Sequence, residues 1–308
     1  MNKTQNPTKL YDQEFEKIEK IGSGAYGKVY KVIYKRDPTK TYALKKYNKE
    51  SLKEGMDVTA LREILILKEL SHPNIEKIID IFYSIDALYV QYEYIDTELS
   101  KLIYETKLEH KHIKNLFHQF LSGLAEMHND GILHRDLKPQ NLLLKASEMK
   151  LKLCDFGLSR MFSLPMGKMT HEIITLWYRP PEVLLGIENY TTKVDSWSIG
   201  CIMAEMITGK PLFPGDCEIG QLFKIFQIMG TPNEDTWPGI YKLKDFSLNF
   251  PQWKPKKLKD LFPNFDKDGL DLMEKFLQMD PDKRITIKDA LNHPFLEKVR
   301  AEEGEDND

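Results

Sequence analysis

The segment from His134 to Asn141, followed shortly by Asp155, carries residue types that phosphate chemistry needs. The carboxylate of Asp136 can accept a proton from a hydroxyl group, and Lys138 offers a positive charge to a phosphate. Asn141 and Asp155 offer the hard oxygen atoms that Mg²⁺ prefers. Together these residues predict the transfer of a phosphoryl group from ATP to a hydroxyl.

A glycine-rich segment near the start of the chain follows the pattern G-x-G-x-x-G-x-V and runs from Ile21 to Val29. Gly22, Gly24 and Gly27 let the backbone approach phosphates closely and present its N–H groups to them. A strand rather than a helix is expected to follow the glycines, which favours a hairpin flap over ATP and argues against a Rossmann turn. Taken alone, such a pattern is more often a glycine-rich hairpin without a ligand.

Ala43 and Lys45 lie two residues apart in a predicted strand and therefore share one of its faces. A small residue next to a lysine suits an adenine beside the methyl group and an ammonium that reaches the phosphates. A single lysine on a strand is usually just exposed. Glu63, in the middle of a predicted helix, can pair with Lys45 and hold its ammonium in place.

The periodicity predicts an α+β fold in which a strand-rich part precedes a larger helical part, with the change near residues 94–99. The predicted helix Thr59–Leu70 has a broad apolar face that includes Leu61 and Leu65. The predicted strands are Phe15–Ile21, Lys28–Tyr34, Thr41–Tyr47 and Ala87–Tyr94. The other predicted helices are Ile113–His128, Asp195–Thr208, Ile219–Met229, Gly269–Gln278 and Ile287–Asn292.

Composition excludes several function classes for this 308-residue chain. A net charge of −3 argues against a nucleic-acid or membrane role driven by bulk charge. The scattered cysteines Cys154, Cys201 and Cys217 indicate neither a disulfide framework nor a metal site, and fit a reducing nuclear or cytoplasmic setting. The first residues are polar, so no signal peptide is expected, and the acidic end is expected to be a flexible tail.

The sequence resembles a eukaryotic protein kinase from Phe15 to Val299, and within that superfamily it is most similar to the cyclin-dependent kinases. The resemblance implies a bilobal kinase domain over residues 15–298, with flexible tails at 1–14 and 299–308. The N-lobe would span about 15–94, the hinge about 93–98 and the C-lobe about 99–298. The segments that carry the resemblance to this family are Thr59-Ala60-Leu61-Arg62-Glu63, Thr170 to Arg179, Leu212-Phe213-Pro214-Gly215-Asp216 and Gly230-Thr231-Pro232.

The resemblance also assigns roles within the site. Asp136 would be the catalytic base, Lys138 would steady the γ-phosphate, and Thr175 would hydrogen-bond both. Asn141 and Asp155 would bind Mg²⁺. The ATP site would be lined by Ile21, Gly22, Gly24, Gly27, Val29, Ala43, Lys45, Tyr92, Glu93, Ile95 and Leu143, with bulky Tyr92 closing the pocket behind the adenine and Glu93 and Ile95 supplying backbone hydrogen bonds.

Regulation is implied at two hydroxyl groups. A phosphate on Thr170 would attract Arg62, Arg135 and Arg160, because phosphate oxygens form strong charge-assisted hydrogen bonds with arginine. Tyr26, at the tip of the glycine flap, would be an inhibitory phosphorylation site, because a phosphate there would repel those of ATP.

Two further residue sets are expected to hold the large lobe together. Glu182 is predicted to pair with Arg284 as a structural lock, and Asp195 is predicted to anchor the backbone of the catalytic loop. The histidines at 110, 112, 118 and 128 are expected to have surface or packing roles.

The predicted function is a serine/threonine kinase for sites followed by proline, activated by a cyclin-like subunit that pushes Glu63 inward and by an upstream kinase acting on Thr170. A Cks-type adaptor is a further possible partner, and nucleic acids and membranes are not expected as partners. Cell-cycle control is favoured over a transcription-linked or kinase-activating role. A cyclin-independent or mitogen-activated-type kinase and a pseudokinase scaffold remain alternatives.

Overall fold

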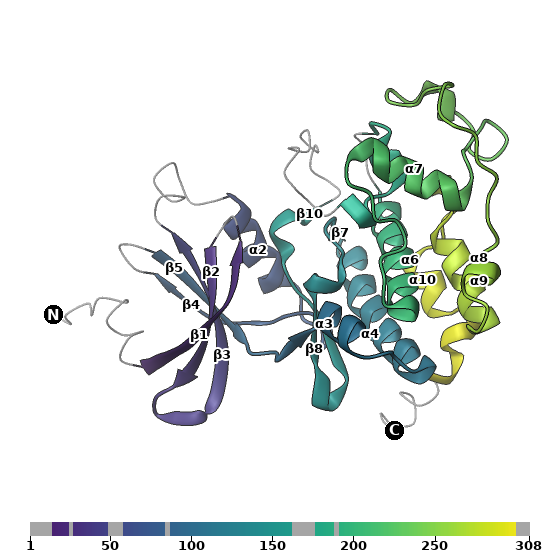
Figure 1. Ribbon diagram of the computed structural model, residues 1–308. Helices are drawn as coiled ribbons and strands as arrows, with labels where there is room; N and C mark the ends of the chain where they lie inside the picture. Colours follow the sequence, from purple (N-terminus) through teal and green to yellow (C-terminus); the bar gives the residue numbers. More distant parts are fainter. Residues whose placement is uncertain are drawn as a thin grey trace.

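The computed structural model describes residues 14–24, 27–48, 58–83, 87–161, 176–187 and 191–299 of the chain. Figure 1 shows two lobes: a small one in which a sheet packs beside the helix Val58–Glu69, and a larger one that is mostly helical. The predicted α+β, two-lobed fold class is therefore confirmed.

The small lobe is built on a five-stranded antiparallel sheet with the strand order β1-β2-β3-β5-β4. Strand β4 was not predicted. A register shift between Ile78 and Asp80 interrupts the alternation by which a strand is recognised. The strands are β1 Phe15–Gly24, β2 Gly27–Tyr34, β3 Asp37–Asn48, β4 Ile78–Tyr83 and β5 Ala87–Glu93.

Successive residues of β3 belong to opposite faces of this sheet. Ala43 and Tyr47 belong to the main hydrophobic core, which continues into helix α2 (Val58–Glu69) and the large lobe. Leu44 lies in a separate core with Phe15 on the other face. This period of two places Lys45 on the face that α2 covers.

The face that helix α2 buries differs from the one that the sequence predicts. Ala60, Ile64 and Leu67 are buried, whereas the side chain of Leu65 is 61% exposed. Residues three or four apart share a helix face, so Leu65 turns outward between two buried neighbours. The prediction that Leu65 belongs to the apolar face is wrong.

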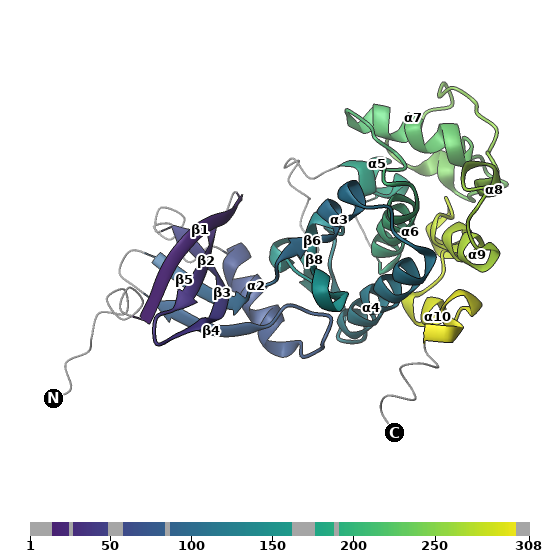
Figure 2. The ribbon, with the colours of Figure 1, turned by 60° about the horizontal axis from the view of Figure 1, so that its bottom comes forward.

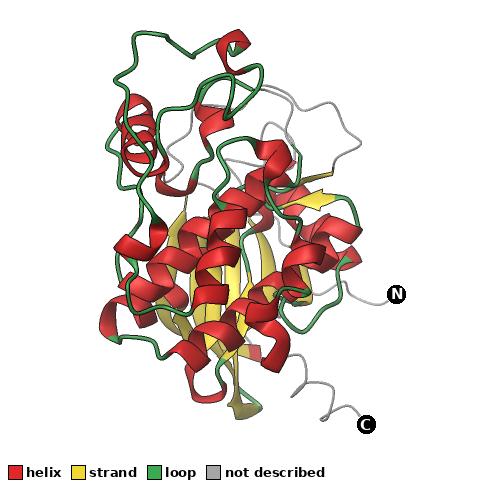
Figure 3. Ribbon diagram, turned by 90° about the vertical axis from the view of Figure 1, so that its right-hand side faces the viewer, coloured by secondary structure: helices red, strands yellow, loops and turns green. Residues whose placement is uncertain are grey.

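The large lobe surrounds two long helices, α4 and α6. Helix α4 presents one apolar face, as predicted, whereas α6 is buried on nearly all sides. Figures 2 and 3 show helices packed beside one another here, with α7 far from the sheet and the strands behind. The helices are α3 Leu99–Glu105, α4 His110–Asn129, α5 Pro181–Leu184, α6 Lys193–Thr208, α7 Glu218–Met229, α8 Leu258–Leu261, α9 Lys267–Phe276 and α10 Ile287–Leu291.

Short strands form two further small sheets, separate from the five-stranded sheet. One small sheet has the order β6-β8-β9, and a separate antiparallel pair joins β7 to β10. Within the described ranges, no helix combines the length and apolar character that crossing a membrane requires. The short strands are β6 Thr97–Glu98, β7 Ile132–Leu133, β8 Leu142–Lys145, β9 Lys150–Leu153 and β10 Arg160–Met161.

The predicted pairing of Glu182 with Arg284 is present, and both residues are buried. Two parallel hydrogen bonds of 2.6 and 2.7 Å join the guanidinium to the carboxylate. The guanidinium also donates to the carbonyl oxygens of Lys193, Gln278 and Met279. The pair therefore ties α5 to the loop that precedes α10.

We expect Glu182→Ala to lower the free energy of unfolding by about 3–5 kcal/mol, because it leaves the charge of Arg284 buried without a partner. Chemical denaturation measures this change. Lys275→Ala, which breaks the exposed pair of Lys275 with Asp271, is the matched control and should cost less than about 1 kcal/mol. Equal effects of the two variants would contradict a structural lock.

Candidate active site

Asp195, near the start of α6, holds the loop that carries Asp136. Its two carboxylate oxygens accept the backbone N–H groups of His134 and Arg135, at 3.0 and 2.9 Å. The ring of His128 lies 2.9 Å from the same carboxylate. Burial opposes the charge of Asp195, but the histidines and N–H donors outweigh it and lower its pKa. The predicted anchor is present, and His128 is an additional partner that the sequence did not indicate.

Two residues of the candidate site adopt an unfavourable backbone conformation. Arg135 has a φ of +72° and Asp155 has a φ of +63°, in the left-handed region that side chains other than glycine rarely adopt. Such strain persists only where the surroundings impose it. At Arg135, the hydrogen bond from its own N–H group to Asp195 supplies part of that constraint.

The described hydrogen-bond donors to the carboxylate of Asp136 all contact the same oxygen. Its Oδ2 atom accepts Lys138 Nζ at 2.7 Å and Asn141 Nδ2 at 3.1 Å. Asn141 Nδ2 also donates to the backbone oxygen of Asp136 at 2.8 Å. Within the described part of the chain, no hydrogen-bond donor contacts Oδ1. With respect to these residues, Oδ1 has no competing donor and can accept a proton.

The β8–β9 hairpin brings the two predicted magnesium ligands close together. Leu142 pairs with Leu153, and the N–H group of Cys154 donates to the backbone oxygen of Asn141 at 3.0 Å. Asn141, just before β8, and Asp155, shortly after β9, therefore lie at the same end of the hairpin.

Their chemistry fits Mg²⁺. The amide nitrogen of Asn141 is committed to Asp136, which leaves its side-chain oxygen available, and the carboxylate of Asp155 is exposed. The described residues contain no cluster of three His, Cys, Asp or Glu side chains suited to a metal. Mg²⁺ usually takes one or two protein oxygens together with substrate phosphates and water, so the pair is sufficient.

The predicted pair of Lys45 and Glu63 is formed. The Nζ atom of Lys45 lies 2.9 and 2.7 Å from the two carboxylate oxygens of Glu63. Burial would lower the pKa of Lys45, but the charge of Glu63, with smaller effects of Tyr47 and Asp155, raises it well above its usual range. The lysine therefore stays charged.

Two tyrosines complete the surroundings of Glu63. The hydroxyl of Tyr47 donates to Oε2 and that of Tyr92 donates to Oε1, both at 2.9 Å. Tyr92 was predicted only as a bulky wall behind the adenine, and Tyr47 was not predicted as a site residue. Both follow the rule that a buried phenol needs a partner, but the sequence alone does not name that partner.

The residues predicted to bind ATP lie along β1, β2, β3, β5 and β8 and in the segment between the lobes. The flap is a strand–glycine–strand hairpin, as predicted, with Gly22 opposite Val29 and Gly24 opposite Gly27. A Cβ atom on Gly27 would lie 2.3 Å from the backbone oxygen of Lys46, so only glycine fits there. Across the sheet, Val29 pairs with Lys45, and Ala43 pairs with Tyr92.

The remaining predicted ATP contacts vary in exposure. Ile21 is 42% exposed at the flap, whereas Glu93, Ile95 and Leu143 are half-buried between the lobes. The side chain of Glu93 forms an ion pair with Lys152 of β9.

The three arginines that were predicted to bind a phosphate on Thr170 come from three elements. Arg62 of α2 donates to the backbone oxygen of Gly157 at 3.3 Å and so links the helix to the segment after Asp155. Arg135 lies in the catalytic loop and Arg160 in β10. Thr170, Thr175 and Tyr26 lie outside the described residues, so the convergence on a phosphate remains a prediction.

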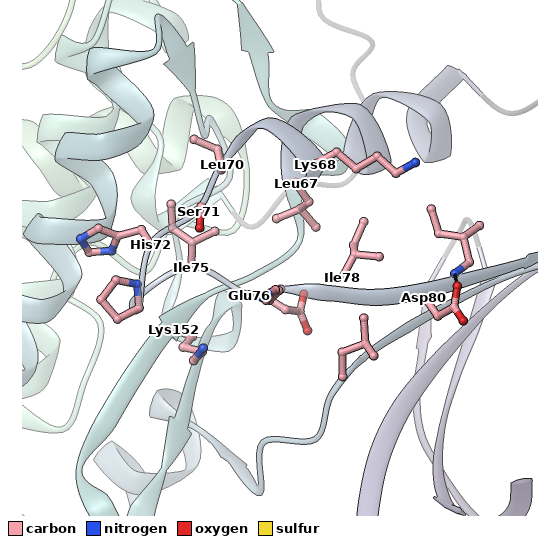
Figure 4. Close-up of a pocket in the computed structure, with 14 residues that line it drawn as sticks. Leu67, Lys68, Leu70, Ser71, His72, Ile75, Glu76, Ile78, Asp80 and Lys152 are labelled. Carbon is pink, nitrogen blue, oxygen red and sulfur yellow. Dashed lines mark hydrogen bonds between the residues drawn. The ribbon is translucent and has the colours of Figure 1, made fainter.

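Glu76 is a carboxyl group that sequence analysis missed. It lines a cavity of about 700 Å³ between the end of α2 and the start of β4, with Lys152 on the same wall (Figure 4). Burial, and then the charge of Glu63, raise the pKa of Glu76 to about 8, although Lys45 opposes this shift. Glu76 is therefore largely neutral at pH 7.

This shift predicts how stability depends on pH. Between about pH 4.5 and pH 8 the folded chain keeps a proton on Glu76 that the unfolded chain releases, so stability falls as pH rises. Glu76→Gln removes this loss. We expect it to raise Tm by about 5 °C at pH 9 and hardly at all at pH 5.

Thermal unfolding from pH 5 to pH 9 measures the effect of Glu76→Gln. Glu69→Gln, at an exposed carboxylate at the end of α2, is the control and should follow the wild type. Parallel curves for Glu76→Gln and the wild type would show that Glu76 is charged in the folded protein.

The chain matches a known protein family over most of its length. Residues 15–296 match the protein kinase domain, which covers most of the 308 residues. The matched range includes the flap, the Lys45–Glu63 pair, the catalytic loop and the β8–β9 hairpin. The chain belongs to the protein kinase family.

Proposed function

We propose that this protein kinase transfers the γ-phosphoryl group of ATP to serine or threonine residues followed by proline. A cyclin-like subunit and phosphorylation of Thr170 activate it, and its role is in cell-cycle control. The observation that carries the chemistry is the carboxylate of Asp136, with one oxygen held by Lys138 and Asn141 and the other without a donor among the described residues.

The second carboxylate oxygen of Asp136, Oδ1, suits a catalytic base. It accepts the proton of the substrate hydroxyl while that hydroxyl oxygen bonds to the γ-phosphorus and the bond to the ADP oxygen breaks. Lys138, which holds the other carboxylate oxygen at 2.7 Å, offers its positive charge to the phosphoryl group in transfer.

The nucleotide is held from the opposite lobe. Lys45 reaches the α- and β-phosphates, with its ammonium fixed by Glu63. Asn141 and Asp155 would hold Mg²⁺, which supplies charge neutralisation at the phosphates when bound.

The proposed partner acts through α2. The helix carries Glu63 on its inner side and an exposed Leu65 between its buried positions, so a partner that covers the outer side can bury apolar surface. Arg62 connects the same helix to Gly157 in the segment that leads to Thr170. The resemblance of residues 59–63 to the cyclin-binding helix supports a cyclin-like subunit.

We expect Asp136→Asn to lower kcat by at least about 1,000-fold while ATP binding stays nearly unchanged, because only the transition state uses the base. Phosphate transfer and nucleotide titration measure the two effects. Asp130→Asn, at an exposed position after α4, is the matched control and should keep full activity. Substantial turnover by Asp136→Asn would contradict the assigned base.

The substrate and partner are tested together with a Ser-Pro-x-Lys peptide, in the presence and absence of a panel of cyclins. We expect phosphate transfer to require proline after the target, to rise strongly with one cyclin, and to fall in Thr170→Ala. Peptides with alanine in place of proline, or tyrosine in place of serine, are the controls. Equal activity without any cyclin would support the cyclin-independent alternative.

A further inference from the structure

Four hydrogen bonds converge on the carboxylate of Glu63. Each oxygen accepts one bond from the ammonium of Lys45 and one from a tyrosine hydroxyl, at distances of 2.7–2.9 Å. Glu63 is 2% exposed, so water offers it little alternative. The ammonium of Lys45 also lies 5.3 Å from the centre of the Tyr47 ring.

All of these donors belong to the sheet, and the acceptor belongs to the helix. Tyr47 follows Lys45 on the same face of β3, and Tyr92 lies in the adjacent strand β5, opposite Ala43. Rotating α2 outward would leave the ammonium and both phenols without their acceptor in a buried place. The hydrogen bonds therefore oppose displacement of the helix from the sheet.

We propose that Tyr47 and Tyr92 are positioning residues that clamp Glu63 onto Lys45, so that the chain itself holds α2 in the arrangement competent for phosphoryl transfer. The clamp is defined by the hydroxyls of Tyr47 and Tyr92 and the carboxylate of Glu63. This inference rests on the proposed function, because the position of Lys45 matters where a nucleotide is used.

The hydroxyl groups of both tyrosines in the clamp stay protonated over the usual pH range. Burial and the charge of Glu63 raise the pKa of both tyrosines well above the usual value, so both remain neutral donors. Their rings are themselves packed in the main core, at 1% and 2% exposure. Replacement by phenylalanine therefore removes the hydroxyl and leaves the packing in place.

The clamp changes what a regulatory subunit has to do. With Glu63 held by two tyrosines, a cyclin-like partner that covers the outer side of α2 would stabilise a position of Glu63 that the chain itself already favours.

The test compares Tyr47→Phe, Tyr92→Phe and the double variant with Tyr42→Phe in the full chain. Tyr42 lies on the same strand, β3, with its ring packed against Phe15 on the other face of the sheet. Hydrogen–deuterium exchange of residues 58–69 reports directly on α2. We expect exchange in this helix to be about 10-fold faster in the double variant and unchanged in Tyr42→Phe.

Steady-state kinetics with Mg-ATP and the Ser-Pro-x-Lys peptide provide the second readout, with the best cyclin of the panel added where the wild type requires it. We expect each single change to lower kcat roughly 3- to 10-fold and the double change roughly 10- to 100-fold. The KM for the peptide should stay the same, because the clamp is remote from the substrate hydroxyl.

The two readouts separate the clamp from the proposed function. If the wild type transfers no phosphate, the proposed function fails, and hydrogen exchange alone decides the clamp. Unchanged exchange in α2 of the double variant would overturn the clamp whatever the kinetics. An equal loss of activity in Tyr42→Phe would also overturn it, because general weakening of the sheet would then explain the effect.

Discussion

The buried carboxylate of Glu63 is the point on which the small lobe depends. An ionised carboxyl group away from water is costly unless it is paired and hydrogen-bonded, and here one ammonium and two phenols meet that need. Each buried phenol left without an acceptor would cost about 1–3 kcal/mol. The electrostatic requirement of one side chain therefore fixes the distance and rotation of α2 against the sheet.

Asp195 is a buried carboxylate in the large lobe, and its charge is stabilised in a different way from that of Glu63. It accepts backbone N–H groups instead of joining two side-chain charges, and so it acts on the shape of the loop. Burial of α6 on nearly all sides fixes the position of this carboxylate. The left-handed conformation of Arg135 then persists, and Asp136, the next residue, faces Lys138 and Asn141. The rigid packing of α6 thus determines the orientation of the Asp136 carboxylate.

Features of the fold and the site could be predicted where the spacing of residues, or the resemblance to a family, has one structural meaning. The glycine flap, the catalytic loop and the Glu182–Arg284 pair follow from spacing and from the resemblance to a family. The roles of Tyr47, Glu76 and His128 could not be predicted, because each depends on which side chain lies opposite in three dimensions. The register of β3 with β5 and the packing of α2 determine those partners, and neither is encoded in one local segment. The prediction that Leu65 is buried was wrong for a related reason, because an apolar residue type does not reveal which side of the helix the residue occupies.

Glu76 shows how the surroundings decide which carboxyl group Lys45 binds. The charges of Glu63, Glu76 and Asp155 all act on one another or on Lys45, and a single ammonium cannot neutralise three carboxylates. Asp155 is exposed, so water stabilises its charge and leaves it available to a cation. Glu76 is kept largely neutral at pH 7, because burial and the nearby charge of Glu63 both oppose its ionisation. Glu63 accepts hydrogen bonds from three donor groups and therefore forms the ion pair with Lys45. The selectivity of this ion pair therefore comes from unequal solvation and hydrogen bonding of three chemically similar groups.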